Sequence, residues 1–160
     1  MAQVLIVYHS HGGNTRKMAE ALAQTVQAAG CAVVLKKVAE ASLDDLRAAD
    51  GVLLGSPCYF GNISAPLKQL IDQSVQLFGK GELEGKPGGA FVSAGGIGGC
   101  GELALNMLVT AMLIHGMVVQ GLRKGGHLGP LAIGAPDERA LEECQRYGQQ
   151  FAALVQRLAS

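Results

Sequence analysis

The sequence predicts an α/β fold in which a parallel β-sheet is covered by helices on both faces. Short apolar runs alternate along the 160 residues with segments whose apolar residues recur at helical spacing, the pattern of parallel strands joined by crossover helices. The composition agrees, because 49% of the residues are hydrophobic and only 16% are charged. Since no linker, repeat or low-complexity tract interrupts the pattern, we expect a single domain over residues 1–160.

Five strands are expected, each a short run rich in aliphatic residues, as in the central strands of a parallel sheet. They cover residues 4–8, 31–38, 51–56, 89–93 and 117–121. The second run includes Lys36 and Lys37, so that strand has the more polar end.

Helices are expected between these strands. The first begins at Thr15 and stops at Gly30, and a short second helix has Ser42 as its N-cap. The third is capped by Ser64 and has Pro66 in its first turn, where a missing N–H does little harm. Its apolar positions are Leu67, Leu70, Ile71, Val75 and Phe78.

The second half of the chain contains an uncharged segment, residues 103–122, with the length of a membrane span. Polar residues interrupt it, so we expect a buried helix over residues 102–114 followed by a buried strand. Residues 122–137 are expected to form a long irregular connection. The last helix then follows Asp137 and Glu138, whose charge suits the positive end of a helix dipole.

Charge and cysteine patterns exclude several functions. The 13 Lys and Arg balance the 13 Asp and Glu, which leaves no electrostatic footprint for nucleic acid or an anionic membrane. The four cysteines form no CxxC pair, so the spacing supports neither a metal site nor a disulfide framework. Because the N-terminus lacks the features of a signal peptide, we expect a cytoplasmic protein with reduced thiols.

Three loops form the candidate site. Ligands of a parallel sheet covered on both faces bind outside the carboxyl ends of its strands. Loop 1 (residues 9–15), loop 2 (56–62) and loop 3 (94–101) follow the first, third and fourth strands. They contain two histidines, His9 and His11, and no Asp, Glu, Lys or Arg. This disfavours hydrolysis by paired carboxylates, and neither GxSxG nor GxxxxGK[ST] occurs in the sequence.

Loop 1 places hydroxyl, amide and glycine residues at the start of a helix. Ser10, Asn14 and Thr15 supply side-chain donors, while Gly12 and Gly13 let the backbone approach a ligand. Free N–H groups and the helix dipole favour an anion there, so we expect a monophosphate. The alternative is an ordinary turn in which Asn14 or Thr15 caps the helix.

Loop 2 is uncharged and carries two adjacent aromatic residues, Tyr59 and Phe60. Such residues at a solvent edge suit stacking on a planar ring, with the backbone available for hydrogen bonds to its polar edge. The alternative is that Phe60 packs inward and Tyr59 merely lies on the surface.

Loop 3 contains Gly96, Gly98 and Gly101 in GxGxxG spacing. A dinucleotide fingerprint would need an acidic residue about twenty positions later, and none occurs between Glu102 and Asp137. We therefore expect the glycines to permit close approach of a flat ligand. Together the loops predict a neutral pocket for a phosphorylated planar molecule, with the chemistry left to a cofactor.

These residues resemble a known family. Loop 1 is similar to the flavodoxin phosphate loop, S/T-x-T-G-x-T, with Gly12 in place of the usual Thr. The stretch "GSPCYFGNISAPLKQLIDQ" resembles the FMN-dependent NAD(P)H:quinone oxidoreductases of the WrbA-like group, as do "FVSAGGIGGCGE" and "LIHGMVV". The resemblance covers residues 3–158. It implies a flavodoxin-like, doubly wound three-layer sandwich with a five-stranded parallel sheet in the order 2-1-3-4-5.

The resemblance also implies an FMN site, with the phosphate on residues 10–15 and the isoalloxazine ring between residues 58–60 and 93–99. The implied FMN-binding residues are Ser10, His11, Gly12, Gly13, Asn14, Thr15, Pro57, Cys58, Tyr59, Phe60, Gly61, Asn62, Ser93, Ala94, Gly95, Gly96, Gly98 and Gly99.

Two residues are candidates for a catalytic role. His115 matches a histidine that approaches the flavin edge in the quinone reductases, often from a neighbouring subunit. The alternative for His115 is a buried polar group that ends a helix. Tyr59 stands where WrbA-like proteins commonly have Arg, so their nicotinamide and quinone contacts do not carry over directly.

The implied function is hydride transfer from NADH or NADPH to N5 of FMN and onward to a quinone-like acceptor. One alternative is a non-enzymatic flavodoxin that docks to redox partner proteins, although such carriers use an acidic face and this chain has no net charge. Another is a flavin-binding regulator or a module without cofactor. The uncharged segment 103–122 indicates self-association, as a homodimer or homotetramer.

Overall fold

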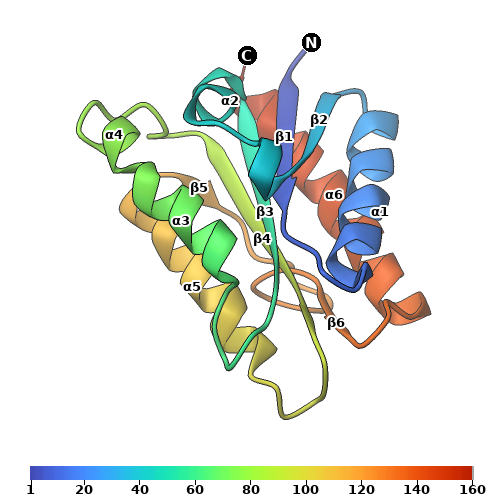
Figure 1. Ribbon diagram of the computed structural model, residues 1–160. Helices are drawn as coiled ribbons and strands as arrows, with labels where there is room; N and C mark the ends of the chain where they lie inside the picture. Colours follow the sequence, from blue (N-terminus) through green and yellow to red (C-terminus); the bar gives the residue numbers. More distant parts are fainter. Residues whose placement is uncertain (160) are drawn as a thin grey trace.

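A parallel β-sheet forms the middle layer of the computed structural model, which describes residues 1–159 (Figure 1). Its strands run in the spatial order β2-β1-β3-β4-β5, which confirms the predicted order. The central strands β1, β3 and β4 are buried on both faces, which accounts for their continuous apolar sequences. The strands are β1 Gln3–Tyr8, β2 Ala32–Lys37, β3 Gly51–Pro57, β4 Pro87–Ala94, β5 Val118–Val119 and β6 Leu131–Ile133.

The fifth position of the sheet is shared by two short strands. β5 pairs with the start of β4, at Pro87 and Gly88, whereas β6 pairs with the end of β4. The predicted strand at residues 117–121 is therefore too long, and the segment 122–137, expected to be irregular, contains β6. Between the two strands the chain turns back on itself, because the Leu122 N–H donates to the His127 carbonyl at 3.0 Å. Because of this turn, residues 117–133 cannot pair with β4 as one continuous strand.

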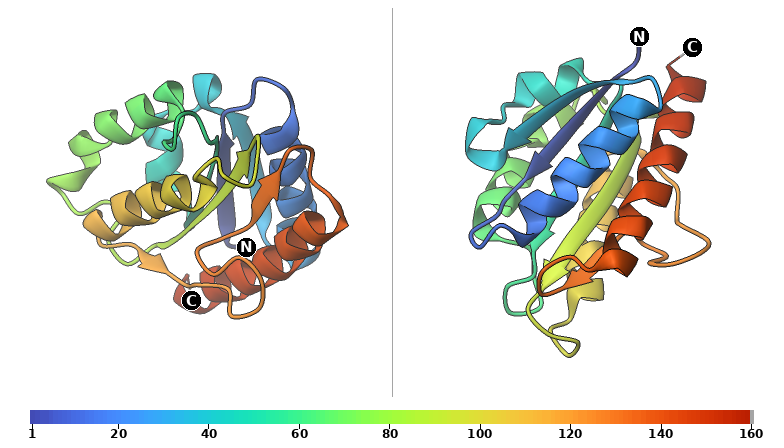
Figure 2. Two further views of the ribbon diagram at one scale, coloured as in Figure 1. Left: turned by 90° about the horizontal axis from the view of Figure 1, so that it is seen from below. Right: turned by 90° about the vertical axis from the view of Figure 1, so that its right-hand side faces the viewer.

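Helices cover both faces of the sheet (Figure 2). α1 and α6 lie side by side on one face, and α3 and α5 cover the other. Alternate strand residues point to opposite faces: Val4 and Ile6 pack toward α1 and α6, Leu5 and Val7 toward α3 and α5. The helices are α1 Asn14–Ala28, α2 Leu43–Ala48, α3 Ala65–Gln73, α4 Val75–Phe78, α5 Gly101–Ile114 and α6 Glu138–Leu158, with a 3₁₀ turn, η1, at Val38–Glu40.

Two glycines of the central strands make room for aromatic side chains. A Cβ atom on Gly55 would lie 2.1 Å from the Phe91 ring, and one on Gly89 would lie 2.6 Å from the Tyr147 hydroxyl. That hydroxyl accepts a hydrogen bond from the Ala90 N–H at 3.3 Å, and burial raises the pKa of Tyr147 to about 12. Part of the high glycine content thus serves core packing.

The helix caps follow the sequence signals in part. Ser42 caps α2 as predicted, since its Oγ accepts from the Asp45 N–H at 3.2 Å and Asp45 accepts from the Ser42 N–H at 2.8 Å. Asp137 caps α6 by accepting a first-turn N–H at 2.9 Å. Ser64 holds the predicted N-cap position of α3, but its hydroxyl makes no cap bond, and its N–H donates to Ser56 Oγ at 2.9 Å.

The predicted third helix is divided at Ser74 into α3 and α4. Val75 and Phe78, expected among its apolar positions, are 66% and 50% exposed. α5 and β5 were expected to be buried, yet Leu113 and Ile114 of α5 face solvent and β5 is only partly covered. No helix within residues 1–159 is both long and apolar enough to span a membrane.

Candidate functional site

The three loops meet at one edge of the sheet, where β1, β3 and β4 end (Figure 1). They surround a depression of about 250 Å³. All of the residues that line it are among those predicted to bind a cofactor: Ser10, His11, Gly12, Asn14, Thr15, Pro57, Cys58, Tyr59, Ser93, Ala94 and Gly95. The other predicted residues lie in the same loops but outside this lining: Gly13, Phe60, Gly61, Asn62, Gly96, Gly98 and Gly99.

Loop 1 leads into α1 without a side-chain cap among the described residues. The N-cap is Gly13, in the left-handed conformation with φ 96°, and its N–H donates to Ser10 Oγ at 3.0 Å. The alternative in which Asn14 or Thr15 caps the helix is therefore wrong. Thr15 is buried, with its Oγ1 2.8 Å from Ser93 Oγ. The first-turn N–H groups of α1 remain available to an anion.

Charge around loop 1 also suits an anion. The first turn of α1 contains no acidic residue. Arg16 lies just inside the helix, half exposed and 3.6 Å from Glu20. The positive end of the α1 dipole is thus not offset by a nearby carboxylate in the first turn.

Loop 2 turns back sharply on itself. The N–H groups and carbonyls of Tyr59 and Asn62 are mutually hydrogen-bonded at 2.9 and 3.0 Å, and Phe60 and Gly61 between them both have positive φ, 52° and 73°. Phe60 is fully exposed, so the alternative in which it packs inward is wrong. Tyr59 is 42% exposed and meets the His9 ring edge-on, with 6.2 Å between ring centroids.

Loop 3 is open where a flat ligand would need space. A Cβ atom on Gly95, Gly96 or Gly98 would meet nothing within 4 Å. Gly101 differs, because a Cβ there would lie 2.5 Å from the Leu131 side chain. The last glycine of the GxGxxG pattern therefore serves the packing of α5, which agrees with rejecting a dinucleotide fingerprint at this loop.

Loop 2 is joined by hydrogen bonds to the end of β4 and to loop 3. The Cys58 N–H donates to the Ser93 carbonyl at 2.7 Å, and Cys58 Sγ lies 3.0 Å from the Gly99 carbonyl. Burial raises the pKa of the Cys58 thiol, which disfavours its thiolate. Cys100 occupies the N-cap of α5 with φ 61°.

Two residues of the candidate loops lie outside the predicted FMN-binding set and the lining of the depression. His9 has a buried Nδ1 without a partner among residues 1–159, and burial, with a smaller effect of His11, lowers its pKa. Ser56 is fully buried and anchors loop 2: its Oγ donates to the Pro57 carbonyl at 2.7 Å and accepts from the Ser64 N–H. No local sequence pattern distinguishes such contacts, because they depend on which segments the fold brings together.

Comparisons with known proteins identify the family. Residues 34–123 match the family described as NADPH-dependent FMN reductase. An NAD(P)H dehydrogenase (quinone) from Archaeoglobus fulgidus is 30% identical over 190 residues, covering 99% of this chain and 100% of that protein. The chain belongs to the flavodoxin-like FMN-dependent NAD(P)H oxidoreductases.

The relatives of this FMN-dependent oxidoreductase also include a protein named flavodoxin. A flavodoxin from Aquifex aeolicus is 36% identical over 164 residues, covering 97% of this chain and 88% of that protein. Among solved structures, a flavodoxin, WrbA-like protein from Agrobacterium tumefaciens has a TM-score of 0.85 and 26% identity, with 98% of this chain and 99% of that chain covered.

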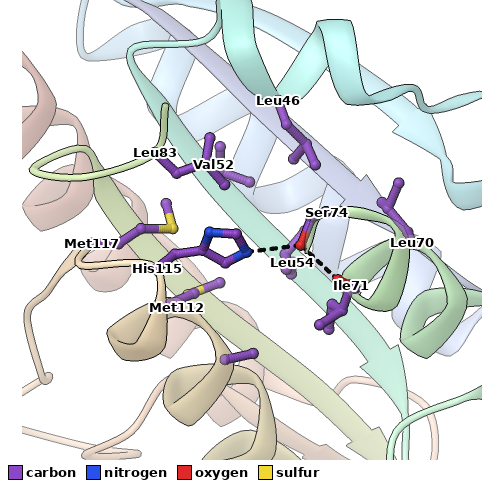
Figure 3. Close-up of a pocket in the computed structure, with 11 residues that line it drawn as sticks. Leu46, Val52, Leu54, Leu70, Ile71, Ser74, Leu83, Met112, His115 and Met117 are labelled. Atoms are coloured by element: carbon purple, nitrogen blue, oxygen red, sulfur yellow. Dashed lines mark hydrogen bonds between the residues drawn. The ribbon is translucent and has the colours of Figure 1, made fainter. Parts of the chain in front are cut away.

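His115 lies away from the three loops of this oxidoreductase. It follows the C-terminal end of α5, whereas loop 3 precedes the N-terminal end of that 14-residue helix. Its Nε2 is 2.8 Å from Ser74 Oγ, and because that hydroxyl donates to the Ile71 carbonyl, Nε2 carries the hydrogen (Figure 3). Burial lowers the pKa of His115. Within one chain His115 is thus a half-buried polar group at a helix end.

Proposed function

We propose that this FMN-dependent oxidoreductase takes electrons from NADH or NADPH and passes them to a quinone-like acceptor at the three-loop depression. The observation that carries the proposal is the depression itself, whose lining contains no Asp, Glu, Lys or Arg and which lies at a helix N-terminus without a side-chain cap. Names of relatives support the reaction, since several are NAD(P)H dehydrogenases (quinone).

The FMN phosphate is assigned to loop 1, which fits it. An anion there meets the free first-turn N–H groups of α1 and the hydroxyl of Ser10, without an opposing carboxylate. Asn14 and Thr15 add side-chain donors from the first turn. Gly12, where a Cβ would meet nothing within 4 Å, keeps the approach free of side chains.

The flavin ring is assigned to the space between loops 2 and 3. Tyr59 and Phe60 present exposed aromatic surface on one side, and the open glycines of loop 3 present backbone on the other. When bound, FMN supplies the hydride and electron transfer that side chains do not. The role of the chain is to hold the phosphate, orient the ring and keep fixed negative charge away from two anionic ligands.

An electron carrier is the alternative, favoured by the relative named flavodoxin. A carrier that docks to protein partners gains from a strongly charged face, and the formal net charge of this chain is zero. The enzyme is therefore the better supported of the two functions.

We further propose that the oxidoreductase self-associates, as a homodimer or homotetramer, through the face formed by α4 and α5. Glu102 is the only charged residue of α5, unusual for a surface helix. On the rim, Lys68 and Asp72 pair at 2.6 Å, and a two-fold axis would let them pair between copies. A catalytic part for His115 requires such an assembly. Exposed apolar residues of this face are Val75, Phe78, Leu103, Met107, Leu113 and Ile114.

Absorption spectroscopy of the purified protein tests the proposed function. Flavin bands that persist through gel filtration, or appear after FMN is added, are expected. NADPH or NADH with a benzoquinone should then give sustained turnover by the FMN-loaded protein. Reduction by nicotinamide that is slow and needs a separate reductase would identify a carrier instead, and failure to bind FMN would refute both functions.

A further inference from the structure

A second cavity lies beside loop 3, next to β6, which pairs only with β4 and so forms a sheet edge. Its volume is about 620 Å³, in the range of small-molecule sites. Ile97 of loop 3 lines it, together with Leu131 and Ile133 of β6, the glycine-rich residues 125–129 and part of α6. It shares no lining residue with the three-loop depression, but loop 3 contributes to both, with Ile97 here and Ala94 and Gly95 there.

Arg139 of α6 is held in a fixed orientation at this cavity. Its Nη1 donates to Glu143 Oε1 at 2.8 Å, and its Nη2 donates to the Leu131 carbonyl at 2.9 Å. A guanidinium has five N–H groups, so these two bonds leave three free, and the side chain is half exposed. An anchored planar cation with spare donors suits a phosphate group, to which it can make parallel hydrogen bonds.

Glu143, one turn further along α6, has an unmet acceptor. The residue is 4% exposed, and its Oε2 is buried without a partner among the described residues. Gly125 and Gly126 pack close to the Glu143 side chain. A Cβ atom on Gly125 would lie 3.0 Å from Glu143 Cγ, and one on Gly126 would lie 3.4 Å from Glu143 Oε2. A buried carboxylate oxygen that lacks a donor is costly, so a ligand hydroxyl or amine that reaches it would stabilise the site.

We propose that this cavity binds the ribose–phosphate part of the nicotinamide dinucleotide donor, an inference that rests on the proposed function. The phosphate supplies acceptors for Arg139, and a ribose hydroxyl supplies the donor that Glu143 lacks. A quinone offers acceptors only and would leave Glu143 unmet. The charged residues of the lining are Arg139, Glu102 and Glu143. Arg123 and Lys124 do not line the cavity, but they are exposed beside residues 125–129 and add positive charge next to it. Because loop 3 contributes residues to both cavities, a donor anchored here would have to extend past loop 3 to meet the flavin.

ADP-ribose tests the site without turnover, because it carries the ribose–phosphate part and no nicotinamide. Calorimetric titration of the FMN-loaded protein should detect binding, and Arg139→Gln should weaken it about tenfold, as expected for loss of a charge-assisted pair. Arg139→Lys, which keeps the charge but loses the fork, should weaken it less. Arg146→Gln is the matched control, since Arg146 lies on the same helix, pairs with Glu142 and does not line the cavity.

Inhibition of the wild-type enzyme provides a second measurement that needs no variant to fold. ADP-ribose should compete with NADPH and leave the KM for benzoquinone unchanged, and Arg139→Gln should raise the KM for NADPH alone. Absence of ADP-ribose binding, unchanged affinity in Arg139→Gln, or competition with benzoquinone would overturn the inference. Failure of the proposed function differs from these results, because the protein would then bind ADP-ribose yet not oxidise NADPH with benzoquinone.

Discussion

Thr15 connects two parts of the proposed FMN site through one buried hydrogen bond. Its side chain is 1% exposed, and its hydroxyl lies 2.8 Å from that of Ser93. This contact joins loop 1 to the end of β4 at the carboxyl end of the sheet. Either hydroxyl can donate, so the pair retains the capacity to bind a phosphate oxygen. The same bond positions the N-terminus of α1 before any ligand arrives.

Thr15→Val should weaken FMN binding about tenfold, because the isosteric side chain lacks the hydroxyl, while costing only about 1 kcal/mol of unfolding free energy. Fluorescence titration with FMN and urea unfolding measure the two effects. Thr25→Val is the control, since the Thr25 hydroxyl donates to the Ala21 carbonyl in the same helix, away from the site. Unchanged FMN affinity in Thr15→Val would refute the phosphate assignment.

Phe60 illustrates strain retained at a proposed binding loop. It is fully exposed in a left-handed conformation that costs a residue with a side chain roughly 1 kcal/mol. Phe60→Gly should therefore raise the free energy of unfolding by up to that amount and yet weaken FMN binding or raise the KM for benzoquinone. Phe60→Tyr, which keeps both ring and strain, should change neither. If Phe60→Gly changes neither the FMN affinity nor the KM for benzoquinone, Phe60 does not stack on the flavin or the quinone.

At the scale of elements, the sequence predicts the central strands and their loops well, because strands buried on both faces must be apolar throughout. The sequence predicts the bounds of the edge strands β5 and β6 poorly. The run around Val118 has the composition of a strand, but where pairing stops depends on the turn that follows it, closed by His127. Likewise nothing local marks Ser74 as the end of α3, since its hydroxyl binds the Ile71 carbonyl and His115 of a distant helix.

The junction of α3, α4 and α5 should respond to pH through His115. Burial lowers its pKa, so the folded chain binds a proton less readily than the unfolded chain. Its contribution to stability is full above the unfolded value of about 6.5 and is lost as the pH falls from there to the lower folded value. Urea unfolding between pH 8 and pH 5 should show this decline.

His115→Phe should reduce that decline without abolishing it. Burial also lowers the pKa of His9, which therefore contributes a loss of stability in the same direction. The wild type and the His115→Phe variant both keep His9 and His11, so the difference between their pH profiles reports on His115 alone. A variant whose stability falls with pH as steeply as that of the wild type would contradict a buried, neutral His115.

At the scale of the whole molecule, the zero net charge and the exposed apolar face formed by α4 and α5 both favour self-association. Zero net charge removes long-range repulsion between copies, and the face formed by α4 and α5 exposes side chains that a monomer would leave in water. The uncharged sequence 103–122 indicated self-association but not its location. Only the fold shows which of those residues the core buries, such as Leu105 and Leu108, and which it leaves outside.

Ile114→Lys should convert the assembly to monomers, because it places a charge on the exposed apolar face, where Ile114 is 64% exposed. Sedimentation velocity over a concentration series measures the change. Leu158→Lys is the control, since Leu158 is similarly exposed, 49%, but lies on α6 at the opposite face. A wild-type protein that is monomeric at all concentrations, or an Ile114→Lys protein that stays assembled, would contradict this interface.

The three loops are proposed to form a flavin site that accepts electrons directly from a nicotinamide donor. Anaerobic stopped-flow mixing of the FMN-loaded protein with NADPH and with NADH, followed at the flavin absorption band, tests it most directly. We expect rapid bleaching of the band by at least one donor and its rapid return when benzoquinone is added. An FMN-loaded protein whose band neither donor bleaches would contradict it.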